Sequence, residues 1–263
     1  MSRLFDSMRR AEDERRKKTS SDAVARETAP SAESEEAPQS STGPWSFSVD
    51  PGAAAGESLR ELGMLRNALE VALAGKTKRT VLFAGAMEGD GTTTIATRYA
   101  RMVALEGRQK VLVCEMNARD PSFAAVFSTN GDAGVTEYFL SGERVASLVR
   151  RSELDNLDVL HVGRQDATAI QLHLNRAFPK LLEEALRDYD TVVIDAPPVI
   201  SSPETPPMAA FVDGVVLVVR AGKTKREAVL RSMDSIANFK GRVFGVVLNR
   251  KRYYIPGFIY KRI

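Results

Sequence analysis

Six short runs rich in Val, Leu and Ile constrain the fold of this chain more than any other feature of its sequence. They lie at residues 80–84, 110–115, 157–162, 191–195, 214–220 and 243–249. Such near-continuous apolar runs are typical of strands buried on both faces of a parallel sheet. Segments with helical periodicity, at residues 93–106, 169–189 and 224–239, separate most of these runs. This alternation predicts an α/β fold with a doubly wound, mostly parallel sheet and helices on both faces.

The chain divides into three parts by composition. Residues 1–55 are poor in apolar clusters and rich in charge, Ser, Ala and Pro, which predicts a disordered N-terminal tail. Near its start, Leu4, Phe5 and Met8 allow two readings, a short docking helix or a frayed solvated helix. Residues 56–250 are predicted to form the folded domain, and residues 251–263 a basic tail that contains tyrosines. The domain should open with a helix that ends at Gly75, since leucines recur at helical spacing at positions 59, 62, 65, 69 and 73.

Composition favours a soluble, cytoplasmic protein. The single cysteine, Cys114, excludes an internal disulfide framework and suits a reducing compartment. No apolar run approaches the roughly 20 residues that a membrane-spanning helix needs. Any membrane association is therefore expected to come through a partner or a surface contact.

The loop after the first predicted strand has the form of a phosphate-binding loop. A glycine-rich segment, residues 85–94, runs directly from that strand into a helix. Such a turn presents backbone N–H groups and the positive end of a helix dipole to a phosphate. Gly89 and Gly91 permit close approach of the backbone, and Thr93 stands where a hydroxyl would bind Mg²⁺. The phosphate-loop pattern requires lysine directly after the second glycine, and this chain has Thr92 there.

Three further loops follow apolar strands and should meet at the same edge of the sheet. Asp195 ends one of these strands, an arrangement suited to holding Mg²⁺. The alternative is that Asp195 is a helix cap or a turn residue. The other two loops begin at Glu115 and at Asn249.

These loops, in this order, resemble those of the bacterial tyrosine kinases of capsule and exopolysaccharide biosynthesis, which are related to the MinD/ParA-type P-loop ATPases. The matching runs are residues 88–94, 117–122, 134–143, 189–199, 212–224 and 245–250. The resemblance covers roughly residues 57–255, and it is specific through the combination of motifs. It implies a P-loop NTPase-like fold.

The resemblance also implies a function. Members of this family bind ATP and Mg²⁺ and phosphorylate tyrosines at their own C-terminus, which here would be Tyr253, Tyr254 and Tyr260. They work with a membrane chain-length-determinant protein, a polysaccharide co-polymerase, at the inner face of the cell membrane. They also form homo-oligomers. Nucleic acid is not an expected partner, because the basic residues lie in tails that contain no known nucleic-acid-binding motif.

Carried over by position, the resemblance assigns roles to individual residues. The phosphates would be held by Gly89, Asp90, Gly91, Thr92, Thr93 and Thr94, and Asn249 would lie on the adenine side. Thr93 and Asp195 would hold Mg²⁺. The two aspartates of the second family loop fall on Glu115 and Asn117, which with Asp195 would be the catalytic positions. A further acidic position falls on Glu204.

The departures from the family pattern fall on the residues expected to take part in phosphoryl transfer. Thr92 replaces the lysine that neutralises the β- and γ-phosphates, Asn117 lacks a negative charge, and Glu115 has a longer arm than aspartate. The family's oligomerisation motif is incomplete, since Gly63 stands at the position of its last arginine.

Three functions remain open on the sequence. The first is a catalytically impaired relative that regulates exopolysaccharide assembly. The second is an active autokinase in which Arg119, or an arginine of a neighbouring subunit, replaces the lysine. The third is a MinD-like ATPase scaffold at a membrane.

Overall fold

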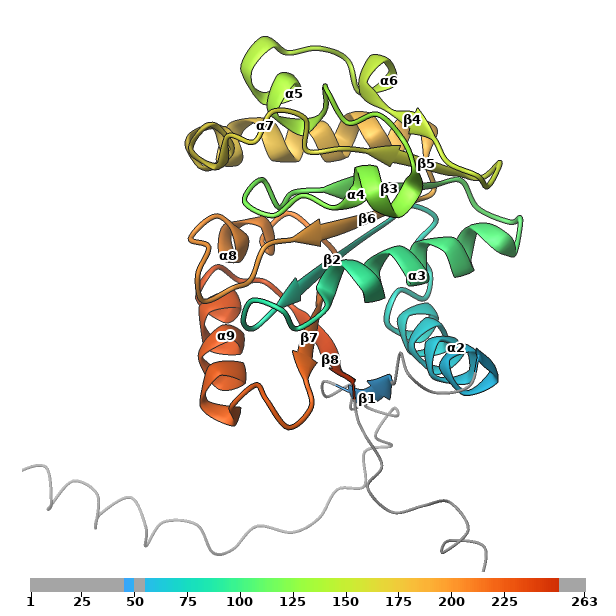
Figure 1. Ribbon diagram of the computed structural model, residues 1–263, viewed down its shortest axis with the longest axis vertical. Coiled ribbons are helices and arrows are strands. Elements are labelled where there is room, and N and C mark those ends of the chain that lie inside the picture. The colour runs from blue at the N-terminus through green and yellow to red at the C-terminus, as the bar shows by residue number, and fades with distance from the viewer. Residues whose placement is uncertain (1–44, 50–54, 251–263) are drawn as a thin grey trace, which may run out of the picture. The chain divides into compact units, whose positions relative to one another are not determined.

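The computed structural model describes residues 45–49 and 55–250, and they form one eight-stranded sheet flanked by helices (Figure 1). The strands are β1 (Trp45–Val49), β2 (Arg79–Gly85), β3 (Val111–Glu115), β4 (Arg150–Arg151), β5 (Leu157–Leu160), β6 (Thr191–Ala196), β7 (Gly214–Arg220) and β8 (Val243–Asn249). The longer helices are α2 (Ala55–Ala72), α3 (Thr92–Leu105), α7 (Ala167–Asp188) and α9 (Arg226–Asn238). The shorter ones are α4 (Phe123–Phe127), α5 (Val135–Ser141), α6 (Val145–Leu148) and α8 (Thr205–Met208).

The strand order is β1-β8-β7-β2-β6-β3-β5-β4, and every neighbouring pair is parallel except β4 with β5. Because β2 lies between β6 and β7, the chain crosses over after β2, and the loop that follows β2 lies at the centre of the carboxyl edge. Loops at such a point are where open parallel sheets bind ligands. The predicted α/β class and the mostly parallel sheet are confirmed.

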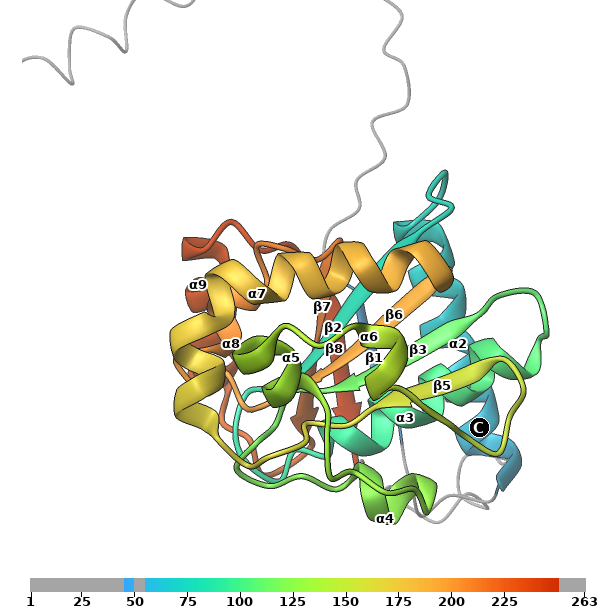
Figure 2. The same cartoon turned by 90° about the horizontal axis from the view of Figure 1, so that it is seen from above.

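Alternate residues of each central strand face opposite layers of helices. Val81 and Phe83 of β2 belong to the apolar cluster that α2 and α3 cover. Leu82 and Ala84 belong to the cluster that α7 covers on the other face. Figure 2 shows α7 crossing one face of the sheet, with α2 and α3 on the opposite side. Helices on both faces, as predicted, therefore hold the central strands.

The first helix of the domain packs through its predicted leucine stripe. Leu65 and Leu69 are fully buried, and Leu62 and Leu73 are nearly so. Full burial of one such side chain contributes about 2 kcal/mol. This stripe fixes α2 against α3, which begins at the loop after β2.

One part of the predicted tail is wrong. Trp45–Val49, which we expected to lie in the disordered segment, forms β1 and pairs in parallel with β8. The physical reason is the alternation of apolar and polar residues in Trp-Ser-Phe-Ser-Val, a period of two that suits an edge strand. The other predictions for residues 1–44 and 251–263, including the docking helix, lie outside the described residues.

No helix in the described part of the chain is both long enough and apolar enough to cross a bilayer.

Candidate functional site

The loop between β2 and α3 has the backbone of an anion-binding turn. Gly89 and Gly91 adopt positive φ angles of 76° and 88°, a conformation that favours glycine. Gly91 is the N-cap of α3, and no side chain caps the helix. The first N–H groups of α3, from Thr92 to Thr94, are therefore open to a ligand at the positive end of the helix dipole. The arrangement suits a phosphate group.

Asp90 holds this loop in place. Its carboxylate accepts hydrogen bonds from the backbone N–H of Met87 (2.8 Å), the backbone N–H of Arg220 (3.2 Å) and the hydroxyl of Thr224. The side chain is buried, with 3 % of Asp90 exposed. Asp90, predicted to bind the phosphates, thus joins the phosphate loop to the end of β7 instead of presenting its carboxylate to a ligand.

Asn249 reaches the same loop from β8. Its side-chain amide donates to the backbone oxygen of Asp90 at 2.8 Å, and its buried Oδ1 has no hydrogen-bond partner. Asn249 therefore supports the loop through one end of its amide. The other end is an acceptor that a bound ligand could satisfy.

Thr93 and Asp195, the predicted Mg²⁺ residues, lie in contact. The Thr93 hydroxyl donates to Oδ2 of Asp195 at 2.7 Å, while the buried Oδ1 of Asp195 has no partner. Burial raises the pKa of Asp195 to about 7, the Thr93 hydrogen bond opposes this rise, and the charge of Glu115 adds to it. A buried carboxylate oxygen without a partner, beside a hydroxyl, has the chemistry of an Mg²⁺ site. The residues present therefore fit the metal, and Thr93 and Asp195 would hold it.

Thr92 is the first residue of α3 and brings no charge to the loop. The side chain is partly buried, and its Oγ1 is 2.9 Å from where a Cβ on Gly85 would lie. Thr94, one residue further on, is also partly buried. The loop therefore offers hydroxyl and backbone donors to a phosphate but no ammonium group.

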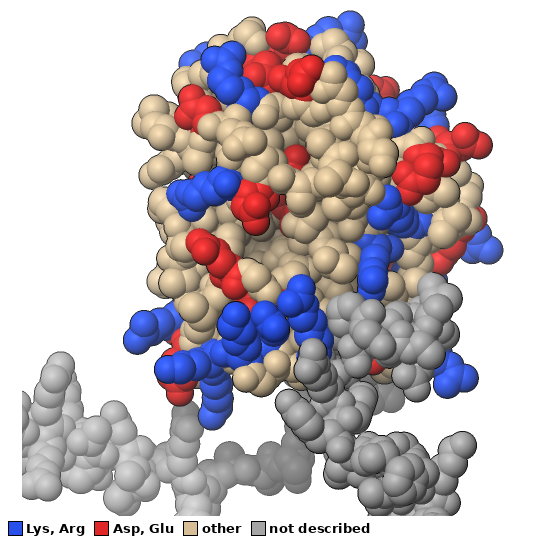
Figure 3. Space-filling view, viewed as in Figure 1, with Lys and Arg blue, Asp and Glu red and all other residues tan. Residues whose placement is uncertain are grey.

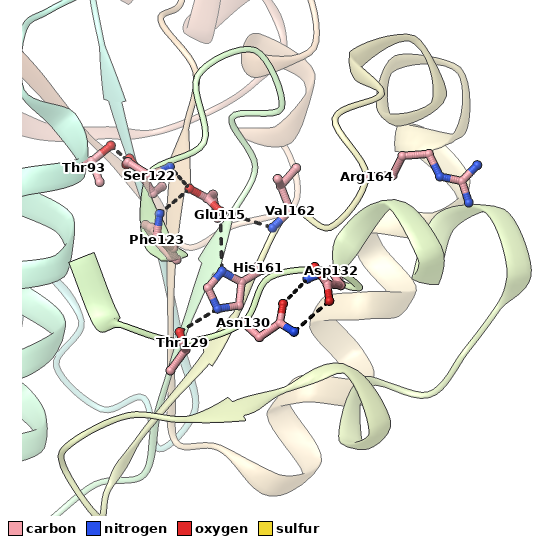
Figure 4. Close-up of polar contacts among 12 residues, drawn as sticks. Thr93, Glu115, Ser122, Phe123, Thr129, Asn130, Asp132, His161, Val162 and Arg164 are labelled. Atoms are coloured by element: carbon pink, nitrogen blue, oxygen red, sulfur yellow. Dashed lines mark hydrogen bonds and ion pairs between the residues drawn. The ribbon is translucent and has the colours of Figure 1, made fainter. Parts of the chain in front are cut away.

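Glu115, predicted to be catalytic, is engaged by the backbone (Figure 4). Its Oε1 accepts from the N–H groups of Ser122 and Phe123, the latter at 2.8 Å, and its Oε2 accepts from the N–H of Val162 at 3.3 Å. Burial raises the pKa of Glu115, and these three hydrogen bonds oppose the rise. The carboxylate thus fixes the start of α4 and joins it to Val162, in the segment that follows β5.

His161 completes this cluster. Its Nδ1 lies 3.9 Å from Oε2 of Glu115, and its Nε2 is 2.8 Å from the Thr129 hydroxyl. Burial and the charge of Arg150 lower the pKa of His161, which keeps the ring neutral. These contacts give the histidine a structural role.

Asn117 and Arg119 lie on the loop that follows β3. Asn117 is partly buried, and its Oδ1 accepts from the N–H of Asp120 at 3.4 Å. Arg119 donates to the backbone oxygen of Ser201 (3.0 Å) and to the hydroxyl of Ser202 (2.6 Å). It also lies 3.4 Å from Glu204 Oε1. Arg119, predicted as a substitute for the missing lysine, is therefore held in the loop after β6.

A polar cavity of about 520 Å³ lies beside Glu115 and His161. It is lined on its other sides by the turn at Thr129–Asp132 and by Gly163 and Gln165, and none of residues 85–94 lines it. This cavity is therefore distinct from the phosphate loop.

The structure brings the loops after β2, β3, β6 and β8 to one edge of the sheet, as the sequence predicted. Sequence reasoning missed Thr224 and Ser202, which contact Asp90 and Arg119. Thr224 ends the matching run at residues 212–224, but no sequence pattern indicated either contact. Tyr253, Tyr254 and Tyr260 lie outside the described residues.

Comparison with known proteins relates the chain to kinases. No family model matches the chain. It is 28 % identical to the tyrosine-protein kinase YwqD of Bacillus subtilis over 72 % of this chain and 79 % of that protein. It is 25 % identical to the tyrosine-protein kinase CpsD of Streptococcus agalactiae over 68 % of this chain and 79 % of that protein.

Solved structures agree. The kinase domain of VpsO matches with a TM-score of 0.65 and 27 % identity, over 76 % of this chain and all of that one. The kinase domain of the Escherichia coli tyrosine kinase ETK matches with a TM-score of 0.71 and 19 % identity, over 80 % of this chain and 92 % of that one. The chain is a homologue of the bacterial tyrosine-protein kinases and has the MinD/ParA-like P-loop fold of their kinase domains.

Proposed function

We propose that this protein is a nucleotide-binding regulatory component of exopolysaccharide or capsule assembly that has lost most of its phosphoryl-transfer activity. The observation that carries the proposal is the phosphate loop, in which Thr92 stands in place of the lysine while Thr93 and Asp195 keep their contact. The loop retains the hydroxyl and carboxylate that would hold Mg²⁺ with a nucleotide. It lacks the lysine that would stabilise the charge of the phosphoryl-transfer transition state.

The case for weak transfer is electrostatic. Phosphoryl transfer depends on positioning and on cations that neutralise the developing charge. Loss of one preorganised donor of this kind costs about 3 kcal/mol, or two orders of magnitude in rate. Arg119 does not replace the lysine in this structure, because Ser202 and Glu204 hold it. The carboxylate of Glu115 is taken up by backbone N–H groups and is not free to act as a base.

The case for binding rests on the groups that remain. The open N-terminus of α3 and the glycines at 89 and 91 support a phosphate site, and Thr93 with Asp195 supports an Mg²⁺ site. Mg²⁺ held there would neutralise phosphate charge. We therefore propose ATP and Mg²⁺ as ligands, a proposal also supported by the fold of cobyrinic acid a,c-diamide synthase from Mycobacterium smegmatis. That protein was solved with an ATP analogue and magnesium, and it matches with a TM-score of 0.55 at 18 % identity, over 65 % of this chain and 72 % of that one.

We further propose that the protein acts at the inner face of the cell membrane through a membrane chain-length-determinant partner. Support comes from the kinase relatives and from the likeness to the chimerical protein CapA2B2, with a TM-score of 0.70 at 23 % identity over 79 % of this chain and 94 % of that one. Coexpression with the determinant protein and copurification from membranes would test this. Recovery of the chain only in the soluble fraction, with the determinant in the membrane, would contradict it.

One assay tests the central proposal. The purified full chain is incubated with ATP and Mg²⁺ and probed for phosphotyrosine, with Asp195→Asn as a control for contaminating kinases. We expect little signal from the native chain. Strong signal that disappears when Tyr253, Tyr254 and Tyr260 are changed to Phe would overturn the proposal in favour of an active autokinase. Absence of nucleotide binding by calorimetry would overturn the nucleotide-binding part.

A further inference from the structure

The strand order gives the candidate nucleotide site two distinct ends. β2, which carries the phosphate loop, lies between β6 on one side and β7 and β8 on the other. Asp195 of β6 marks one end, and Asn249 of β8 marks the other. In P-loop proteins the metal held by the loop hydroxyl and the strand-end aspartate bridges the β- and γ-phosphates. The terminal phosphates of a bound nucleotide therefore belong at the Asp195 end.

The Asp195 end is rich in buried carboxyl groups. Asp195, Glu204 and Glu115 are each at most 3 % exposed. Asp195 Oδ1 and Glu204 Oε2 lack hydrogen-bond partners. Within the described residues, no lysine or arginine forms an ion pair with Asp195, and Arg119 is the arginine paired with Glu204. Ser202 and Glu204 already hold Arg119. With Thr92 in the loop, a third phosphate would therefore meet no unengaged lysine or arginine of the described residues at this end.

The opposite end is positively charged. Alternation along β7 places Arg220 on the same face as Val216 and Val218, which belong to the cluster covered by α3. Its backbone N–H is bonded to Asp90, so the residue lies against the phosphate loop. Its guanidinium forms no hydrogen bond or ion pair with the described part of the chain.

More cations follow Arg220 in the sequence. They are Lys223, Lys225 and Arg226, at the loop from β7 to the start of α9. Figure 3 shows basic side chains gathered on the lower part of the face, where Figure 1 places this loop. A nucleotide with its terminal phosphates at the Asp195 end would have these cations on the side of its first phosphates and the carboxylates on the side of its last.

Resting on the nucleotide binding proposed above, we propose that the site is selective for a nucleoside diphosphate over a triphosphate. A diphosphate takes the backbone donors of the loop and of α3 without extending a third phosphate toward Asp195 and Glu204. Mg²⁺ bound by Thr93 and Asp195 offsets part of this repulsion, so the selectivity is greatest without the metal. The fraction of this protein that is bound would then follow the concentration of the diphosphate, which is the product of ATP-consuming reactions.

Titration calorimetry on the full chain tests the proposal, with ADP and ATP as ligands, in EDTA and in excess Mg²⁺. We expect ADP to bind at least about tenfold more tightly than ATP in EDTA, with a smaller difference in Mg²⁺. Thr92→Lys should restore a cation beside the third phosphate and raise ATP affinity relative to ADP by about tenfold or more. The matched control is Thr168→Lys, the same change at an exposed position in the first turn of α7, which should leave the ratio unchanged.

The possible results separate the selectivity proposed here from the nucleotide binding proposed above. ATP affinity in EDTA equal to or greater than ADP affinity would overturn the selectivity and leave nucleotide binding standing. An unchanged ratio in Thr92→Lys, with a native circular dichroism spectrum and melting temperature, would overturn the electrostatic cause. Absence of binding by both nucleotides would overturn the proposed function as well.

Discussion

The hydroxyl of Thr93 donates a 2.7 Å hydrogen bond to Oδ2 of Asp195, while Oδ1 of the same carboxylate is buried without a partner. One residue belongs to the first turn of α3 and the other to the end of β6, so the contact joins the phosphate loop to the neighbouring strand. A hydroxyl is a weak partner for a buried charge. This part of the site is therefore strained electrostatically until a cation or a proton arrives.

Asp195→Asn should stabilise the protein at neutral and higher pH. The pKa of this carboxyl rises from 3.8 to about 7 on folding, chiefly through burial. Because the folded pKa is raised, the native state holds the proton more tightly. Its contribution to stability is fully present below the unfolded pKa and is lost as pH rises through about 7.

Asparagine removes the ionisation, and one pKa step corresponds to about 1.4 kcal/mol. We expect Asp195→Asn to gain about 2 to 4 kcal/mol over the native protein at about pH 8, and much less at about pH 5. Urea unfolding of both proteins in EDTA measures this difference. An equal difference at the two pH values would show that the buried charge is not its cause.

Asp90→Ala should loosen the phosphate loop. The change leaves the N–H of Met87 without its acceptor and leaves the N–H of Arg220 with the Thr224 hydroxyl alone. A lost hydrogen bond to a charged group costs about 1.5 to 3 kcal/mol. We expect a loss of about 2 to 4 kcal/mol in unfolding free energy, together with faster proteolysis in the loop. Asp132→Ala, at an exposed aspartate in another loop, is the control and should lose less than about 1 kcal/mol. Equal losses in the two variants would contradict the anchoring role.

Much of this fold could be predicted because its central strands are buried on both faces. Runs such as Val215–Val219 have no polar residue to suggest a solvent face, and they fix the parallel sheet. β1 could not be found in the same way, because its five residues stand among polar residues and its alternation is short. The helices α4 and α8 have five and four residues, too few to show a helical period.

The site was predictable in its location but not in its contacts. The rule that ligands bind at the carboxyl ends of strands brought Gly91, Asp195 and Asn249 together correctly. No local pattern indicates that Asp90 meets Thr224, because 134 positions separate them. The role of Glu115 was also not predictable from a local pattern. Its charge suggests a catalytic role, but its burial and its hydrogen bond to the start of α4 give it a structural one.

Glu115→Asp separates that structural role from a catalytic one. Aspartate is the family residue, so a catalytic role predicts higher phosphotransfer in the variant. The structure predicts the opposite, because the shorter arm withdraws the acceptor from the N–H groups of Ser122 and Phe123. We expect a loss of about 1 to 3 kcal/mol in stability and no gain in phosphotyrosine.

The control for this variant is Glu183→Asp, the same change at an exposed surface pair. It should alter stability by less than about 0.5 kcal/mol. A rise in phosphotyrosine in Glu115→Asp without loss of stability would refute the structural interpretation.

Gly91→Ala tests how closely the phosphate loop packs on β8. Gly91 has a positive φ of 88°, and a Cβ at this position would lie 2.1 Å from Nδ2 of Asn249. The substitution therefore combines backbone strain with a steric clash. Gly142 has a similar φ of 70° with nothing within 4 Å of its Cβ position, so Gly142→Ala carries the strain alone. We expect a loss of about 1 kcal/mol for Gly142→Ala and about 3 kcal/mol for Gly91→Ala, measured by chemical unfolding.

The clash can be relieved from the other side. In Gly91→Ala with Asn249→Ala, the methyl group no longer meets the amide, although the Asn249 hydrogen bond to Asp90 is also lost. We expect the double variant to be more stable than the sum of the two single losses by about 1 kcal/mol, a coupling that a double-mutant cycle measures. Additive losses would mean that the loop moves away from β8 without cost. The contact between Asn249 and the phosphate loop would then not be what fixes the loop's conformation.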